Sequence, residues 1–144
     1  MRSLALDIGE RRIGVAVSDP LGISAAPLEV LEDLSPDDLR DYVEEKVRQG
    51  VEVVVVGLPL TCRGKEGAQA LHAQEYARRI EGIEGAVVVL WDERFSTVEA
   101  ERRLREAGRS TRGRKLDAEA AAVILQAYLE YRRRGGEGEE QGGA

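Results

Sequence analysis

Hydrophobic residues in this chain follow two patterns, short continuous runs and stripes with a spacing of three or four. The continuous runs cover residues 2–8, 13–18, 51–57 and 86–91. Runs of this length between turn residues are typical of strands that are buried on both faces. The polar link at residues 9–12 is short, so we expect the first two runs to form an antiparallel hairpin. A weaker strand is predicted over residues 24–31, where Pro27 indicates a sheet edge or a bulge.

The striped segments predict helices that alternate with the later strands. Ser35 and Pro36 supply a cap and a proline at the first helical position, and an apolar stripe with a spacing of four then runs as far as Gly50. Three further helices are predicted, one after the polar loop at residues 61–67, one over residues 96–107 and one over residues 117–133. Residues 109–115 show no periodicity and are expected to form a loop.

The order of these elements predicts one α/β domain, with a sheet that is antiparallel on one side and parallel on the other. A length of 144 residues suits a single domain, which we expect to span residues 1–134. Hydrophobic residues make up 42% of the chain but aromatic residues only 4%, so the core must be aliphatic and rich in alanine. Residues 135–144 have low complexity and are expected to form a disordered tail.

The chain has one cysteine, Cys62, and one histidine, His72. An intrachain disulfide and a zinc site built from cysteine and histidine are therefore excluded, and a metal would need oxygen ligands. We expect His72 to lie on a helix surface and Cys62 to have no role in its loop. No basic-then-apolar leader and no run of about 20 apolar residues is present, which favours a cytoplasmic protein without contact to a membrane.

Charge is distributed unevenly along the chain, although the net charge is only −6. Residues 29–52 contain nine acids and three bases, whereas residues 94–115 contain eight bases and three acids. The basic segment could hold a polyanion on one side of the molecule. A solvated helix face followed by a loop would produce the same charge pattern, and composition does not decide between the two.

Three acidic residues occupy positions where α/β proteins carry their chemistry. Asp7 lies inside the first apolar run, Glu93 follows the last strand, and Asp117 begins the last helix. An unpaired buried carboxylate costs several kcal/mol, so Asp7 needs a cation or hydrogen-bond donors nearby. Three carboxylates brought together would raise one another's pKa values, and a divalent cation reverses that effect. Hard oxygen ligands suit Mg²⁺ or Mn²⁺.

Each of these acids also has a purely structural interpretation. Asp7 could cap the following turn or pair with Arg11 or Arg12, and Glu93 could pair with Arg94 or Arg11. Asp117 could be only a helix cap. Asp92 competes with Glu93 for the inward position, and Asp19 could serve only a turn.

Four segments of the chain resemble the motifs of the YqgF family, a group similar to Holliday junction resolvases. The matching segments are Asp7-Ile8-Gly9 with residues 12–19, Val56 to Leu60, Asp92 to Thr97 with Ala100, and Asp117 with Ala120-Ala121 and residues 124–129. Together they extend over residues 7–129. One departure concerns the loop after the second motif, which usually has an Asn-x-Asp-Gly-like sequence and here contains Thr61-Cys62-Arg63-Gly64.

The resemblance implies an RNase H-like fold, a five-stranded mixed sheet of order 3-2-1-4-5 with an antiparallel second strand and helices on both faces. It also implies a hydrolase that cleaves phosphodiester bonds in structured nucleic acid, with Asp7, Glu93 and Asp117 as metal ligands. Members of the family are described as resolvases of Holliday junctions and as nucleases that mature the 5′ end of pre-16S ribosomal RNA. The sequence does not choose between these substrates and does not indicate an oligomeric state.

Seven basic residues are expected to bind the phosphates of a nucleic-acid substrate, because they lie beside the acids or in the basic segment. They are Arg11, Arg12, Arg94, Arg109, Arg112, Arg114 and Lys115. Phosphate contacts position a substrate without reading its sequence. The sequence shows no aromatic platform for stacked bases, so recognition of structure is expected rather than of sequence.

Two other classes of function fit parts of the pattern. An Asp-x-Gly segment before a hairpin also begins the phosphate-binding part of actin-like and sugar-kinase-like proteins, but those need two such domains. A catalytically silent module that binds RNA or protein during ribosome assembly or transcription would tolerate loss of the Asp7 carboxylate.

Overall fold

The computed structural model describes residues 1–59, 67–96, 102 and 116–135. The strands are β1 (Arg2–Ile8), β2 (Arg12–Ser18), β3 (Ala25–Glu32), β4 (Val51–Leu58) and β5 (Val87–Asp92). The helices are α1 (Pro36–Arg48), α2 (Ala68–Ile80), the short 3-10 helix η1 (Glu93–Phe95) and α4 (Leu116–Arg133). These bounds confirm the predicted strands and the first, second and last helices. The helix predicted over residues 96–107, the loops at 61–67 and 109–115, and the tail lie largely or wholly outside the described residues.

The five strands form one mixed sheet of order β3-β2-β1-β4-β5, which confirms the predicted fold class. β2 is antiparallel to both β1 and β3, whereas β4 is parallel to β1 and to β5. β3 is one of the two edge strands. The register of its pairing with β2 shifts at Val15/Ala16, where Pro27 lies opposite Ala16. Pro27 therefore lies both on an edge strand and next to a bulge, in agreement with its missing N–H.

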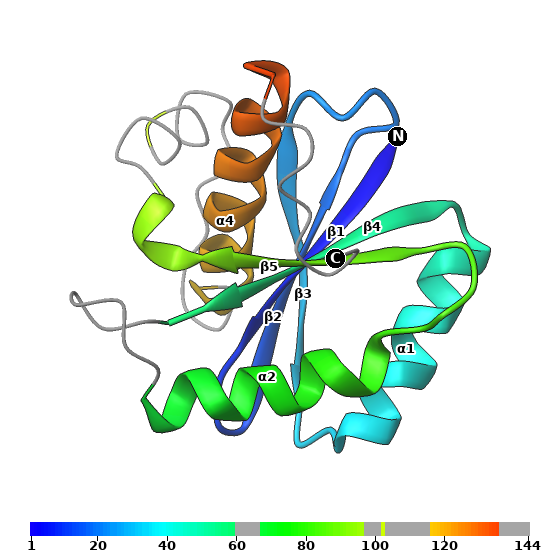
Figure 1. Ribbon diagram of the computed structural model, residues 1–144, viewed down its shortest axis with the longest axis vertical. Helices are drawn as coiled ribbons and strands as arrows, with labels where there is room; N and C mark the ends of the chain where they lie inside the picture. Colours follow the sequence, from blue (N-terminus) through cyan, green and yellow to red (C-terminus); the bar gives the residue numbers. More distant parts are fainter. Residues whose placement is uncertain (60–66, 97–101, 103–115, 136–144) are drawn as a thin grey trace.

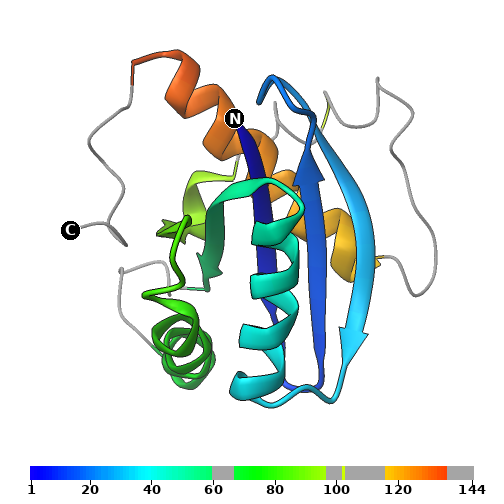
Figure 2. The same cartoon turned by 90° about the vertical axis from the view of Figure 1, so that its right-hand side faces the viewer.

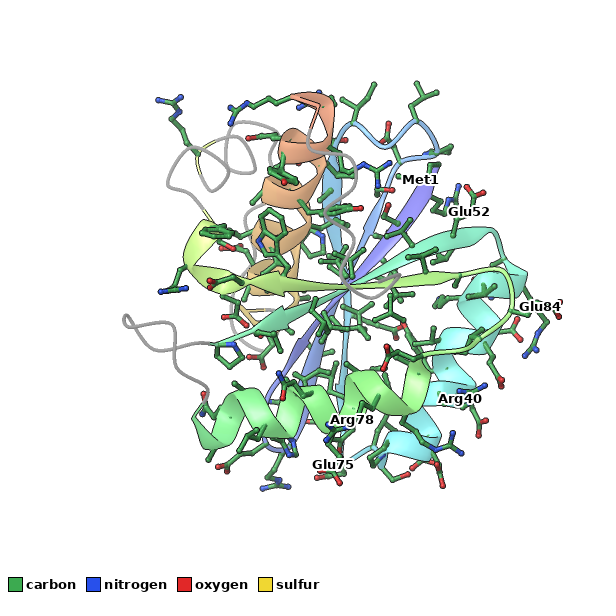
Figure 3. All side chains as sticks on the ribbon, viewed as in Figure 1. Met1, Arg40, Glu52, Glu75, Arg78 and Glu84 are labelled. Atoms are coloured by element: carbon green, nitrogen blue, oxygen red, sulfur yellow. The ribbon has the colours of Figure 1, made fainter. Side chains whose placement is uncertain are left out.

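Helices cover both faces of the sheet. α1 and α2 pack on one face and α4 packs on the other (Figures 1 and 2). The outer side of the α1–α2 layer is charged, and Glu75, Arg78 and Glu84 point into solvent there (Figure 3). None of the described helices is both long and apolar enough to cross a membrane.

The two faces of β1 carry different side chains because successive residues of a strand point to opposite sides. Leu4, Leu6 and Ile8 pack toward α1 and α2, in a core of leucine, isoleucine and valine. Ala5 packs toward α4, where the strands offer mainly small side chains and α4 itself is rich in alanine. Alternation places Asp7 on the α4 face as well. Small residues on both partners let α4 approach the strands closely.

Candidate active site

Asp7 lies in a row of four residues that crosses the sheet on the α4 face. Gly14 of β2 stands opposite Asp7 in the antiparallel pair. On the other side Leu6 pairs with Val56, so Gly57 is the next residue beside Asp7, and Gly57 pairs in turn with Trp91 of β5. Directly neighbouring residues of adjacent strands project to the same face. The two glycines therefore leave open space on both sides of the Asp7 carboxylate.

Glu93 fills the space above Gly57. It is the first residue of η1, directly after β5 ends at Asp92. A Cβ atom at position 57 would lie 2.8 Å from Glu93 Oε2 and 2.7 Å from Ile124 Cδ1, so no residue other than glycine fits without displacing one of these groups. Because Gly57 has no side chain, the carboxylate of Glu93 can lie over the sheet and approach β1.

The side chains of Asp7 and Glu93 hydrogen-bond to each other. A bond between two carboxyl groups requires that one of them carries a proton. Burial, followed by the charge of Asp117, raises the pKa of Asp7 to about 6. Burial, followed by the charge of Asp7, raises the pKa of Glu93 to about 7. Near neutral pH the pair therefore holds a proton that a cation can displace.

Asp117 reaches the same place from α4. A Cβ atom at Gly14 would lie only 1.9 Å from the backbone oxygen of Asp117, so the start of α4 rests directly on β2. The carboxylate of Asp117 forms an ion pair with Arg12, with 3.1 Å between Oδ2 and Nε. Its negative charge still acts on Asp7 and contributes to the raised pKa there.

The structure thus brings the three predicted acids into one region, but only two of them are in contact with each other. Asp7 and Glu93 are in contact, whereas the Asp117 carboxylate is paired with Arg12. As the side chains are placed, no group of three His, Cys, Asp or Glu residues within the described ranges could hold a metal ion. A shared ion would require the carboxylate of Asp117 to turn from Arg12 toward Asp7.

The neighbouring acids take the structural roles that the sequence left open. Asp92 binds Arg94, with 2.6 Å between Oδ2 and Nη2, and this arginine lowers the pKa of Asp92. Glu93 is therefore the acid that points inward. Asp19 accepts hydrogen bonds from the backbone N–H groups of Ile23 and Ser24, so it stabilises a turn.

The predicted phosphate-binding residues fall into two groups. Arg11 and Arg12 are mostly exposed and border a polar hollow of about 490 Å³, where Arg11 also pairs with Asp33. Arg94 lies on η1 and pairs with Asp92. The other four residues lie outside the described part of the chain: Arg109, Arg112, Arg114 and Lys115.

Comparison with known proteins identifies the family. Residues 1–131 match the model of the RuvX family, described as Holliday junction resolvase. This chain belongs to the RuvX family. A relative from Desulforudis audaxviator is 44% identical over 138 residues, which is 94% of this chain and 98% of the relative. A relative from Anaeromyxobacter sp. is 46% identical over 136 residues, 92% of this chain and 98% of the relative. Both are named "Putative pre-16S rRNA nuclease".

Solved structures support the fold of this RuvX-family chain. The RuvC of T. thermophilus in complex with a Holliday junction substrate aligns with a TM-score of 0.64 and 18% identity, covering 94% of this chain and 96% of that chain. The Holliday junction resolvase of fowlpox virus aligns with a TM-score of 0.53 and 14% identity, covering 90% of this chain and 99% of that chain. Family membership makes the chain a nuclease, a hydrolase whose partner is nucleic acid.

Sequence reasoning missed several residues that shape the site of this RuvX-family protein. Gly14 and Gly57 lie inside strand patterns, and a glycine in a strand is a signal of close approach by another group. His72 lies on helix α2, as expected, but its contact was not predicted: its ring nitrogen lies 3.2 Å from the carbonyl oxygen of Gly9. It therefore links α2 to the turn after β1. The aromatic side chains near η1 were missed as well.

Proposed function

We propose that this chain processes precursor 16S ribosomal RNA in the cytoplasm, by hydrolysis of phosphodiester bonds at a divalent-metal site formed by Asp7, Glu93 and Asp117. The observation that carries the proposal is the contact between Asp7 and Glu93 beside the charge of Asp117. The names of its relatives support the choice of RNA. The description of the RuvX family supports Holliday junction DNA, with a role in recombination, as the second candidate substrate.

The donor set fits Mg²⁺ or Mn²⁺ in its chemistry. The site offers only carboxylate oxygens, which are the hard ligands that both ions prefer. Burial and mutual repulsion raise the pKa values of Asp7 and Glu93, and a dication would relieve that repulsion. When bound, such ions would activate a water molecule and stabilise the leaving oxygen.

The chain's own residues hold the carboxylates and guide the substrate. The strand position of Asp7 and the gap at Gly57 hold two of the proposed ligands over the sheet, and the contact at Gly14 holds the start of α4, which carries Asp117, on β2. Arg12 neutralises Asp117 and is half-exposed, so its guanidinium can bind a substrate phosphate once that carboxylate turns away. Arg11 lies beside it on the rim of the same hollow.

Cleavage of two substrates side by side tests the proposal. Purified protein would be incubated with 5′-extended pre-16S ribosomal RNA and with a four-way DNA junction, in Mg²⁺ or Mn²⁺. We expect cleavage of the RNA, and a loss of roughly a thousandfold in Asp7→Asn and Glu93→Gln, since each removes several kcal/mol of charge stabilisation. Asp19→Asn is the matched control and should cleave normally.

Three outcomes would change the proposal. Equal cleavage by the wild type and by both site variants would contradict it, because a contaminant or another site would then be responsible. Cleavage of the DNA junction alone would replace RNA by DNA as the substrate. Tight RNA binding without cleavage, unchanged in Asp7→Asn, would support the silent binding module instead.

A further inference from the structure

A second hollow, of about 290 Å³, lies between the end of β5 and the C-terminal half of α4. It is lined by Trp91, Phe95, Ala127, Glu130, Tyr131 and Arg134. The chain contains one Trp, one Phe and four Tyr residues, and four of these six meet here. The ring of Trp91 lies 5.8 Å from Phe95, 5.7 Å from Tyr128 and 5.5 Å from Tyr131, each edge to face. The sequence alone did not indicate that these rings meet.

The rings of this cluster differ in exposure. Trp91 and Tyr128 are 7% and 2% exposed and belong to the core, whereas Phe95 is 59% exposed. In addition, the indole N–H of Trp91 is buried and forms no hydrogen bond with a described residue. A buried donor without a partner is costly, so an acceptor that reached it would gain from the contact. The hollow thus has aromatic walls and one exposed ring, and one of its lining residues carries an unused donor.

Two elements connect the hollow with the candidate active site, the row of residues across the sheet and the helix η1. Trp91 is the last member of the row that contains Asp7 and Gly57, and it precedes Glu93 by two residues. The helix η1 carries Glu93 at its first position and Phe95 at its last. A nucleic-acid strand with a phosphate at the acids therefore has a neighbouring base within reach of the hollow.

The chemistry of the lining favours a nucleobase over an apolar protein side chain. Every base has a π-face that stacks on aromatic rings, and its edge carries hydrogen-bonding groups. Arg134 lines the hollow together with Glu130, and Arg94, which pairs with Asp92, lies on η1 next to Phe95, so two guanidinium groups lie near the place where the phosphates beside a bound base would be. An apolar side chain would use neither the charge nor the indole donor.

We infer that this hollow is a binding subsite for one unpaired nucleobase of the substrate, next to the scissile phosphate. The inference rests on the proposed nuclease function, since that function makes the molecule that enters the hollow a nucleic-acid strand. It adds a feature to that function, because the chain would require an unstacked base near the cleavage site. Single-stranded or distorted segments would then be bound better than a regular duplex.

The fluorescence of Trp91 provides a direct test, because it is the only tryptophan of the chain. The full-length protein in EDTA would be titrated with a short oligouridylate and with an abasic strand of equal length and charge. We expect saturable quenching by the oligouridylate alone. Phe95→Ala should weaken oligouridylate binding roughly tenfold and leave abasic binding unchanged, since base stacking on an aromatic ring is lost.

Two variants serve as controls. Phe95→Tyr keeps an aromatic ring and should restore binding of the oligouridylate. Leu71→Ala removes an equally exposed apolar side chain, 53% exposed, from α2 and should bind like the wild type. Equal affinity of the wild type for both strands, or no quenching by either, would overturn the inference.

The same titration separates this inference from the proposed function. Asp7→Asn should still show base-dependent quenching, because Asp7 does not line the hollow. If the wild type cleaves RNA but shows no base dependence, only the subsite is wrong. If base dependence is found without any cleavage, the proposed nuclease site is wrong and the subsite stands.

Discussion

At the scale of single residues, the decisive feature is the contact between two half-buried carboxyl groups, those of Asp7 and Glu93. Asp7 and Glu93 have raised pKa values because burial and mutual repulsion disfavour their charged forms. A structural ion pair would instead lower the pKa, as Arg94 does for Asp92. In the metal-free protein the pair therefore does not stabilise the fold near neutral pH, which supports the proposal that it binds a cation.

The raised pKa values predict how stability depends on pH in the metal-free protein. Both groups have a higher pKa in the folded chain than in the unfolded chain, so the folded state binds more protons between about pH 4 and pH 7. The free energy of unfolding should thus fall as the pH rises through this window, by about 1–3 kcal/mol after allowance for solvent screening.

Urea unfolding in EDTA at about pH 5 and about pH 8 measures this change. Because other groups also titrate, the comparison is with Asp7→Asn, which cannot ionise at that position and should lose less stability over the same range. An identical loss in the wild type and the variant would contradict the assignment of the raised pKa values.

Arg12 gives a second prediction at this scale. Its guanidinium pairs with Asp117 and so competes with any cation for that carboxylate. Arg12→Gln should increase the affinity for Mn²⁺ about three- to tenfold, because a nearby positive charge is removed. Calorimetric titration with Mn²⁺ measures the affinity.

The control for this prediction is Arg11→Gln, since Arg11 pairs with Asp33 and not with a candidate ligand. That variant should bind Mn²⁺ like the wild type. Weaker metal binding by Arg12→Gln than by the control would show that Arg12 supports the site rather than competing for it.

At the scale of elements, the site depends on how closely α4 approaches the sheet. The backbone of Asp117 rests on Gly14, and Ile124 fits over Gly57. Ala118, Ala121 and Ala122 are buried near the start of α4, so this part of the helix can lie close to the strands. Glycine and alanine thus set the distance between Asp7 and Asp117.

Gly14→Ala should therefore destabilise the protein by about 3 kcal/mol, because the new Cβ would meet a backbone carbonyl that cannot rotate away. Metal binding should weaken at the same time, since α4 must move outward. Gly67→Ala, where no atom lies within 4 Å of the added Cβ, is the control and should destabilise the protein by at most about 1 kcal/mol, because Gly67 is the N-cap of α2 and alanine is a poorer cap than glycine. Equal stability of the two variants in thermal unfolding would contradict the close contact.

The elements themselves could be predicted from the sequence, since continuous valines, spaced leucines and caps are local signals. The three acids could be selected because Asp7 interrupts a strand, Glu93 follows one and Asp117 begins a helix. What could not be predicted was the pairing of charges: which of Arg11, Arg12 and Arg94 binds which acid depends on distances between distant segments. The aromatic hollow could not be predicted for the same reason, because Trp91 and Tyr131 meet only in the folded chain.

At the scale of the whole molecule, charge is separated along the chain. The segment at residues 29–52, which includes α1, is acidic, and the segment at residues 94–115 is basic. A chain with a net charge of −6 can therefore still carry a segment that attracts a polyanion.

This distribution predicts a salt-dependent contribution from the basic segment. Replacing Arg112 and Arg114 by alanine should weaken binding of substrate RNA, and the loss should be larger at low salt than at high salt, since each removed phosphate contact reduces the counterion release. Filter binding in EDTA, where no cleavage is expected, measures the affinity for the RNA. No change at either salt concentration would exclude this segment from substrate binding.

Titration of the protein with Mn²⁺ in a calorimeter is the most direct measurement of the central claim, that three distant acids together hold divalent ions. We predict saturable binding with release of protons near pH 7 in the wild type, loss of that binding in Asp7→Asn, Glu93→Gln and Asp117→Asn, and normal binding in Asp19→Asn. Binding of equal strength in the three site variants and the wild type would contradict the account.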